Sequence, residues 1–149
     1  MKSIFNPADN AELIARINNL TAFTPARWGK MNAAQMMAHM QVGMNIAFGN
    51  SKRVTHWIGL VFGSIGKRRM LRDGDFDKHI PTFKQAQITN DRSFVAEKQK
   101  LIALIESALV ITQAGLAKYP HPYFGKFKND EWARLNWKHF DHHLRQFGV

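Results

Sequence analysis

Cysteine is absent from the 149 residues of the sequence. The chain therefore forms no disulfide bond, offers no thiolate ligand to a metal ion and has no thiol nucleophile of its own. If thiol chemistry takes place on this protein, the thiol must arrive with the substrate.

Acidic residues are scarce: 11 Asp and Glu stand against 21 Lys and Arg, and the formal net charge is +10. This balance favours anionic partners, such as small acids, acidic lipid or nucleic acid. The basic residues are dispersed, however, and their tightest group, from Lys67 to Arg72, contains no run of five like charges. Dispersed charge is typical of a solvated surface, so nucleic acid is the less favoured partner.

Long apolar runs are also missing. The most apolar stretch, from Trp57 to Ile65, is interrupted by Gly59 and Gly63, and it has about half of the ~20 residues that a membrane-spanning helix needs. It predicts a short core helix with a basic end. The first nine residues lack the apolar segment of a signal peptide. We therefore expect no membrane span and a cytoplasmic location.

The residues that are present predict an all-α fold in a single domain over 1–149. Four segments have the apolar periodicity of helices, at about 6–19, 32–49, 93–118 and 129–148. Asn6 and Asn32 are suited to cap the first two, and Gln35 completes a capping box with Asn32. These segments predict a four-helix bundle. The intervening residues 51–92 would form a long crossover between parallel neighbours, a lid or a dimer contact.

Histidines form the best candidate site. His139 and His143 are four residues apart on a predicted helix, so their imidazoles lie one turn apart on one face and could reach one metal ion. His39 lies on the apolar face of the helix at 32–49, among methionines. Taken singly, each of these residues is better explained by a surface position or by a hydrogen-bonded position in the core. Three buried imidazoles that face one another would each need a polar partner, and one divalent ion would satisfy all three.

Three nitrogen ligands leave coordination positions open, which is typical of a catalytic site and not of a closed structural one. Such ligands suit zinc, nickel, iron or copper, with zinc or nickel favoured here. Ligand imidazoles normally donate their other N–H to a polar partner, and Gln35, Asn136 and Gln146 are candidates for that role.

Three further residues near the histidine pair have other expected roles. His142 is expected to point to solvent or to a neighbouring helix. His121, in the loop before the last helix, could line the site mouth, but a role in a turn is the favoured interpretation. Asp141 lies on a different face from His139 and is a poor candidate for a general base.

These residues also resemble a known family. The stretch Asn32–His39 is similar to the second helix of DinB-like (YfiT-like) proteins, and His139–Gln146 is similar to their closing motif of two histidines followed by glutamine. The stretch from His121 through Trp132 to Gly148 resembles a branch of that superfamily without an assigned function. The resemblance implies an up-down-down-up four-helix bundle, often a homodimer, whose three metal ligands map onto His39, His139 and His143.

The leading functional hypothesis is a metal-dependent enzyme acting on a small molecule. Superfamily members include transferases and isomerases that use low-molecular-weight thiols, so the resemblance implies a thiol-dependent transferase. If water takes the place of the thiol, the reaction is a hydrolysis. The alternatives are a basic module that binds nucleic acid or another polyanion, and a metal-binding dimer without catalysis.

Overall fold

The computed structural model of the chain describes residues 2–50, 57–111 and 120–149. Within these ranges the protein is all-helical, with five α-helices and no β-strand. The helices are α1 (Pro7–Asn18), α2 (Ala33–Ala47), α3 (Trp57–Leu71), α4 (Phe94–Val110) and α5 (Asn129–Gln146), with a short 3₁₀ helix, η1 (Lys84–Ala86), between α3 and α4. The predicted all-α class is therefore confirmed for the described residues.

The first two helices begin where their capping residues predict. The Asn6 side chain accepts hydrogen bonds from the backbone N–H groups of Ala8 and Asp9 at the start of α1. Asn32 and Gln35 form the predicted reciprocal capping box at the start of α2. In both cases the side chains satisfy backbone donors that the first turn of a helix leaves without partners.

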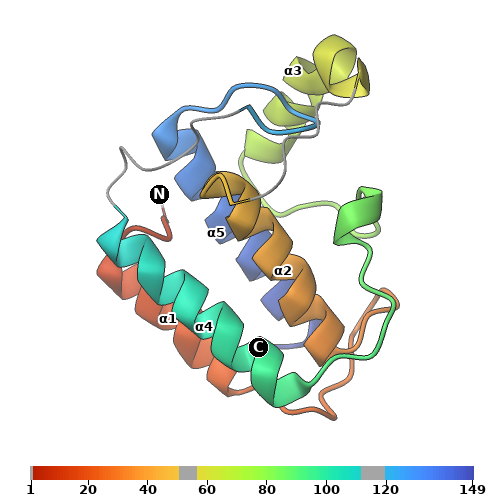
Figure 1. Cartoon of the computed structure of the whole chain (residues 1–149), viewed down its shortest axis with the longest axis vertical. Helices are drawn as coiled ribbons and strands as arrows, with labels where there is room; N and C mark the ends of the chain where they lie inside the picture. Colours follow the sequence, from red (N-terminus) through yellow and green to blue (C-terminus); the bar gives the residue numbers. More distant parts are fainter. Residues whose placement is uncertain (1, 51–56, 112–119) are drawn as a thin grey trace.

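Four of the helices enclose the core. α2 packs against α4 and α5, and α1 packs against the same two helices from the opposite side (Figure 1). Large side chains on their inner faces are fully buried, and they include Met36, Met37, Met40, Met44, Leu101, Ile105, Phe140 and Leu144. The methionine-rich face of α2 is therefore part of the core.

Two helix ends differ from the sequence expectations. The short apolar helix expected at 57–65 continues to Leu71, because the basic residues that follow lie in the last turn, where positive charge is favourable. The helix expected at 93–118 begins as predicted, with Ser93 as its cap, but α4 ends at Val110. Residues 112–118 lie outside the described ranges.

Ion pairs and hydrogen bonds hold the end of α3 and the connection after it against α5. Arg134 on α5 forms an ion pair with Asp73 at 2.6 Å, and Arg145 on the same helix pairs with Asp75 at 2.9 Å. Lys138 donates hydrogen bonds to the backbone carbonyls of Met70 and Arg72. No helix in the described ranges is long and apolar enough to cross a membrane.

Candidate metal centre

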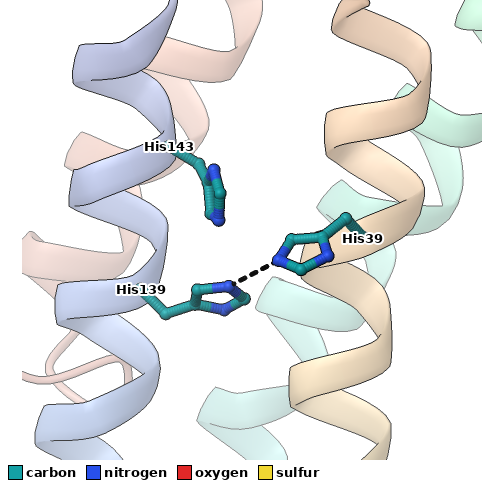
Figure 2. A group of neighbouring side chains, drawn as sticks. All are labelled: His39, His139 and His143. Atoms are coloured by element: carbon teal, nitrogen blue, oxygen red, sulfur yellow. Dashed lines mark hydrogen bonds between the residues drawn. The ribbon is translucent and has the colours of Figure 1, made fainter. Parts of the chain in front are cut away.

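The two faces that carry the three predicted histidines point toward each other. His39 lies in the middle of α2, and His139 and His143 lie one turn apart on α5, which packs against α2. Figure 2 shows the three imidazoles converging in the space between the two helices. One ring nitrogen from each residue lies within 4.8 Å of the other two. The structure thus brings together the three residues that the sequence singled out.

His39 is oriented by a backbone carbonyl. Its Nδ1 lies 2.7 Å from the carbonyl oxygen of Ala86 in η1. Because a carbonyl oxygen only accepts, Nδ1 must carry the proton, and Nε2 keeps its lone pair. This Nε2 lies 3.0 Å from Nε2 of His139, so His139 is the donor between the two rings.

His143 is oriented in the same way by a side chain. Its Nδ1 lies 2.7 Å from Oε1 of Gln146, and the Gln146 amide in turn donates to the backbone carbonyl of Trp28 at 2.5 Å. That second hydrogen bond fixes which end of the amide is the oxygen. His143 therefore also carries its proton on Nδ1 and presents the lone pair of Nε2 to the cluster.

His139 lies against a glycine of α2. A Cβ atom at residue 43 would be 3.1 Å from Nδ1 of His139 and 3.3 Å from its Cε1, closer than side chains normally approach. The glycine thus gives this ring the room to lie between the helices. To bind a metal through Nε2, His139 must carry its proton on Nδ1, the nitrogen that faces Gly43.

All three imidazoles favour the neutral form. Burial lowers the pKa of His143 to about 3, and the nearby His39 adds to the effect. Burial also lowers the pKa of His39, and burial together with the neighbouring His143 and His39 lowers the pKa of His139 well below its usual range. Because only a neutral imidazole binds a metal ion, the cluster is in the ligand form at neutral pH.

The donor set fits a divalent transition metal. Two nitrogens bonded to one zinc ion at about 2.0–2.1 Å lie roughly 3–4 Å apart, so the separations in this cluster require only small side-chain adjustments. Two of the three rings already present Nε2 lone pairs, and both have the hydrogen-bond partner on Nδ1 that metal-bound imidazoles normally have. No carboxylate or fourth histidine of the described residues belongs to the cluster.

The cluster lies in the wall of a cavity of about 270 Å³. The other walls are mainly apolar and aromatic, and they include Trp28, Ile46, Phe76, Phe83, Phe124 and Trp132. No Asp or Glu of the described residues lines the cavity, and Lys30 is its one Lys or Arg. A small molecule that enters would therefore meet an apolar chamber with three imidazoles on one side.

Comparison with known proteins identifies the family. Residues 5–148 match the family described as Protein of unknown function (DUF1569). The chain belongs to this family. No curated protein and no solved structure gives a significant match to the chain.

The region that matches DUF1569 contains His39, His139 and His143, together with Gln146. The candidate metal centre therefore lies within the part of the chain that defines membership of the family. The description of DUF1569 assigns no activity, so the chemistry must be argued from the site itself.

Three other residues that the sequence singled out, Asn136, Gln35 and Asp141, bond to groups outside the three-histidine cluster of this DUF1569 protein. Asn136 is buried in the cavity wall, where its amide donates to the carbonyl of Trp132 at 3.0 Å. Gln35 forms hydrogen bonds with Asn32 and with the carbonyl of Asn90. Asp141 forms ion pairs with Arg16 and Arg145 at 2.7 and 2.9 Å and so supports α5.

Three further histidines, His79, His121 and His142, also line the cavity. His142 is half-buried, with its ring 5.6 Å from that of Trp28 and 5.7 Å from that of Phe76. His121 forms part of a turn and lines the cavity as well, so both roles considered for it are present.

Sequence reasoning missed the parts of the site that come from loops. Ala86, whose carbonyl orients His39, and the cavity residues Trp28, Phe76 and Phe83 lie outside the four long helices. A backbone carbonyl has no sequence signature, because every residue carries one. The aromatic residues of the connection were visible in the sequence, but no period placed them on a particular face.

Proposed function

We propose that His39, His139 and His143 hold one divalent transition metal, zinc or nickel, and that this protein is a metal-dependent enzyme acting on a small molecule. The observation that carries the proposal is the convergence of three neutral imidazoles in the wall of a cavity. A purely structural metal site would be closed by a fourth protein ligand, whereas three ligands beside a cavity leave room for a reactant.

Different residues of the chain have different roles at the proposed site. A divalent metal lowers the pKa of a thiol or a water molecule and thereby supplies a nucleophile near neutral pH. Ala86 and Gln146 hold two of the ligand imidazoles in the required tautomer. The aromatic walls, including Trp28 and Phe83, limit the access of bulk water to the reacting groups.

A low-molecular-weight thiol is the proposed source of the nucleophile, which makes the protein a thiol-dependent transferase. The absence of cysteine leaves no protein thiol to compete for the metal. Cellular thiols commonly carry carboxylates, which the net charge of +10 attracts. The cavity fits such a reactant electrostatically, because no carboxylate of the described residues lines it and Lys30 does.

Metal content tests the site. In untagged protein, elemental analysis should find one metal ion per chain, and His139→Ala and His143→Ala should each abolish it. The matched control is His142→Ala, which removes a cavity histidine of the same helix that does not belong to the cluster. It should retain full metal content. Circular dichroism checks that each variant is folded. Full metal in the His139→Ala, His143→Ala double variant would disprove the site.

The absorption spectrum of the cobalt-substituted protein tests the thiol. A small anionic thiol at millimolar concentration should add a sulfur-to-metal charge-transfer band. The band should be absent from the His143→Ala variant treated in the same way. If a panel of cellular thiols leaves the wild-type spectrum unchanged, the transferase is excluded, and the hydrolase becomes the leading reaction.

The proposal also includes membership of the DinB-like superfamily, in a single domain over 1–149. The ring of contacts among α1, α2, α4 and α5 supports a four-helix bundle. The colours in Figure 1, which follow the chain, support an up-down-down-up order, since α1 and α5 run against α2 and α4. The superfamily further implies a homodimer, which sedimentation of the metal-loaded protein tests.

A further inference from the structure

His121 is held rigidly in the cavity wall. Its backbone N–H donates to the carbonyl of Gly125 at 2.8 Å, and the Gly125 N–H donates back to the carbonyl of His121 at 3.1 Å. Gly125 adopts a positive φ of 74°, which closes this turn. The imidazole stacks on Phe124 with the ring centroids 4.5 Å apart. Only 7% of the residue is exposed, although it lines the cavity.

The hydrogen bonds of the turn determine the tautomer of His121. The backbone N–H of Tyr123 lies 3.1 Å from Nδ1 of His121. Because a backbone N–H only donates, Nδ1 is an acceptor and the ring proton must be on Nε2. Burial lowers the pKa of His121 to about 4, so this neutral tautomer is the form present at neutral pH. Such a ring can donate through Nε2–H but cannot act as a base there.

The hydrogen bonds of the turn do not involve the Nε2–H group of His121. Among the described residues, Nε2 of His121 has no hydrogen-bond acceptor, and the ring does not belong to the metal-binding cluster. Among the described residues, the fully buried nitrogens without a partner are Nε1 of Trp132 and Nε1 of Trp137. The Nε2–H of His121 therefore keeps some accessible surface and can donate to a molecule in the cavity. The helix α3 supports the turn closely, since a Cβ at Gly66 would lie 3.0 Å from the ring of Phe124.

We infer that His121 is a substrate-binding residue whose Nε2–H donates to an oxygen of the substrate, and that the substrate is a small, largely apolar molecule with one carbonyl or carboxylate group. The inference rests on the proposed function, because it takes the cavity beside the three-histidine cluster to be the active site. The apolar walls accept the body of such a molecule. The lack of a lining carboxylate among the described residues disfavours a cationic one.

Calorimetric titration of the full-length, zinc-loaded protein tests the inference with three probes of similar size: phenylacetate, phenylacetamide and 2-phenylethylammonium. Phenylacetate and phenylacetamide carry the oxygen acceptor and should bind, whereas the ammonium compound lacks it and should not. His121→Phe keeps an aromatic ring but removes the donor, and it should weaken phenylacetate binding about tenfold or more. His121→Gln restores an N–H donor and should recover most of the affinity.

A second measurement uses only the wild-type protein, so it does not depend on how the variants fold. Nitrogen-15 NMR of the zinc-loaded protein should find His121 protonated on Nε2, and phenylacetate should shift that proton downfield. The inference would be overturned if wild type and His121→Phe bound phenylacetate with equal affinity. It would also be overturned if the wild type did not bind phenylacetate, or if the ring proton of His121 were on Nδ1. Zinc content is measured in parallel. A wild-type protein without zinc contradicts the proposed function, whereas unchanged zinc with unchanged affinity contradicts the role of His121 alone.

Discussion

Two oxygen atoms outside the cluster determine what its imidazoles can do. The carbonyl of Ala86 and the Oε1 atom of Gln146 each place a proton on the Nδ1 atom of one ring, at 2.7 Å in both cases. An imidazole that is free to choose its tautomer, or to rotate, must be ordered when the metal binds. For His39 and His143 that ordering is complete before binding, which favours metal affinity, whereas His139 must move its proton from Nε2 to Nδ1 when the metal binds.

Gln146→Leu should therefore weaken metal binding, by about 10- to 100-fold. The substitution removes the acceptor for His143 while keeping a side chain of similar size. The matched control is Gln35→Leu, which removes a capping side chain from α2 and should lower the free energy of unfolding with little change in metal affinity. Competition with a chromophoric chelator measures the affinity. Equal affinity in the wild type and Gln146→Leu would contradict the prediction, and a loss in Gln35→Leu would instead assign a supporting role to Gln35.

At the scale of helices, the beginnings could be predicted and some of the ends could not. Asn6, Asn32 and Ser93 are capping residues whose side chains bond to the first turn, so each start has a local signal. The end of α4 has no comparable signal, because apolar residues continue past Val110 in the helical period.

For the site, the i,i+4 histidine pair on α5 could be predicted, because helix geometry alone places residues four apart on one face. The cavity could not, since it depends on how the connection between α3 and α4 packs.

The helix α5 should be indispensable for folding. It buries Trp132, Phe140 and Leu144 almost completely. Truncating a single buried aromatic side chain costs about 3–5 kcal/mol, and the whole stability of a domain is about 5–15 kcal/mol. A chain that ends at Asn129 should therefore show no cooperative thermal unfolding by circular dichroism. A chain that lacks only Val149 loses the hydrogen bonds of that residue with Arg16 and Leu144 and the packing of one partly buried side chain, and it should still unfold cooperatively. A cooperative transition in the shorter chain would show that α5 is not part of the core.

At the scale of the whole molecule, the excess of positive charge is less concentrated than the sequence implies. Within the group from Lys67 to Arg72, Lys67 pairs with Glu131, and both Arg69 and Arg72 pair with Asp77. These ion pairs neutralise part of the densest basic segment. A nucleic acid that approached this segment would have to compete with Glu131 and Asp77 for these side chains. The positive charge is better matched to small anions that diffuse toward the molecule.

Acid should destabilise the protein before its carboxylates titrate. An unfolded chain protonates its histidines near pH 6.5, whereas burial holds the pKa of His143 at about 3 and that of His121 at about 4. Below pH 6.5 the unfolded state therefore binds more protons than the folded state, and stability falls as the pH decreases. Each of the two residues contributes a slope of about 1.4 kcal/mol per pH unit until the pH approaches its folded-state pKa.

Urea unfolding in the presence of a chelator measures this slope. Glutamate side chains of the unfolded chain are half-protonated at about pH 4.3 and only about a tenth protonated at about pH 5.3, so the histidines dominate the interval between about pH 6.5 and 5.3. The denaturation midpoint should fall steadily across that interval. His121→Phe should reduce the slope, because Phe binds no proton in either state. Saturating zinc should raise the midpoint across the whole interval, because zinc binds the folded state, in which burial keeps the ligand imidazoles neutral. A midpoint that stays constant from pH 7 to 4.5 without metal would mean that the histidines are accessible to protons in the folded protein, and the buried cluster would have to be abandoned.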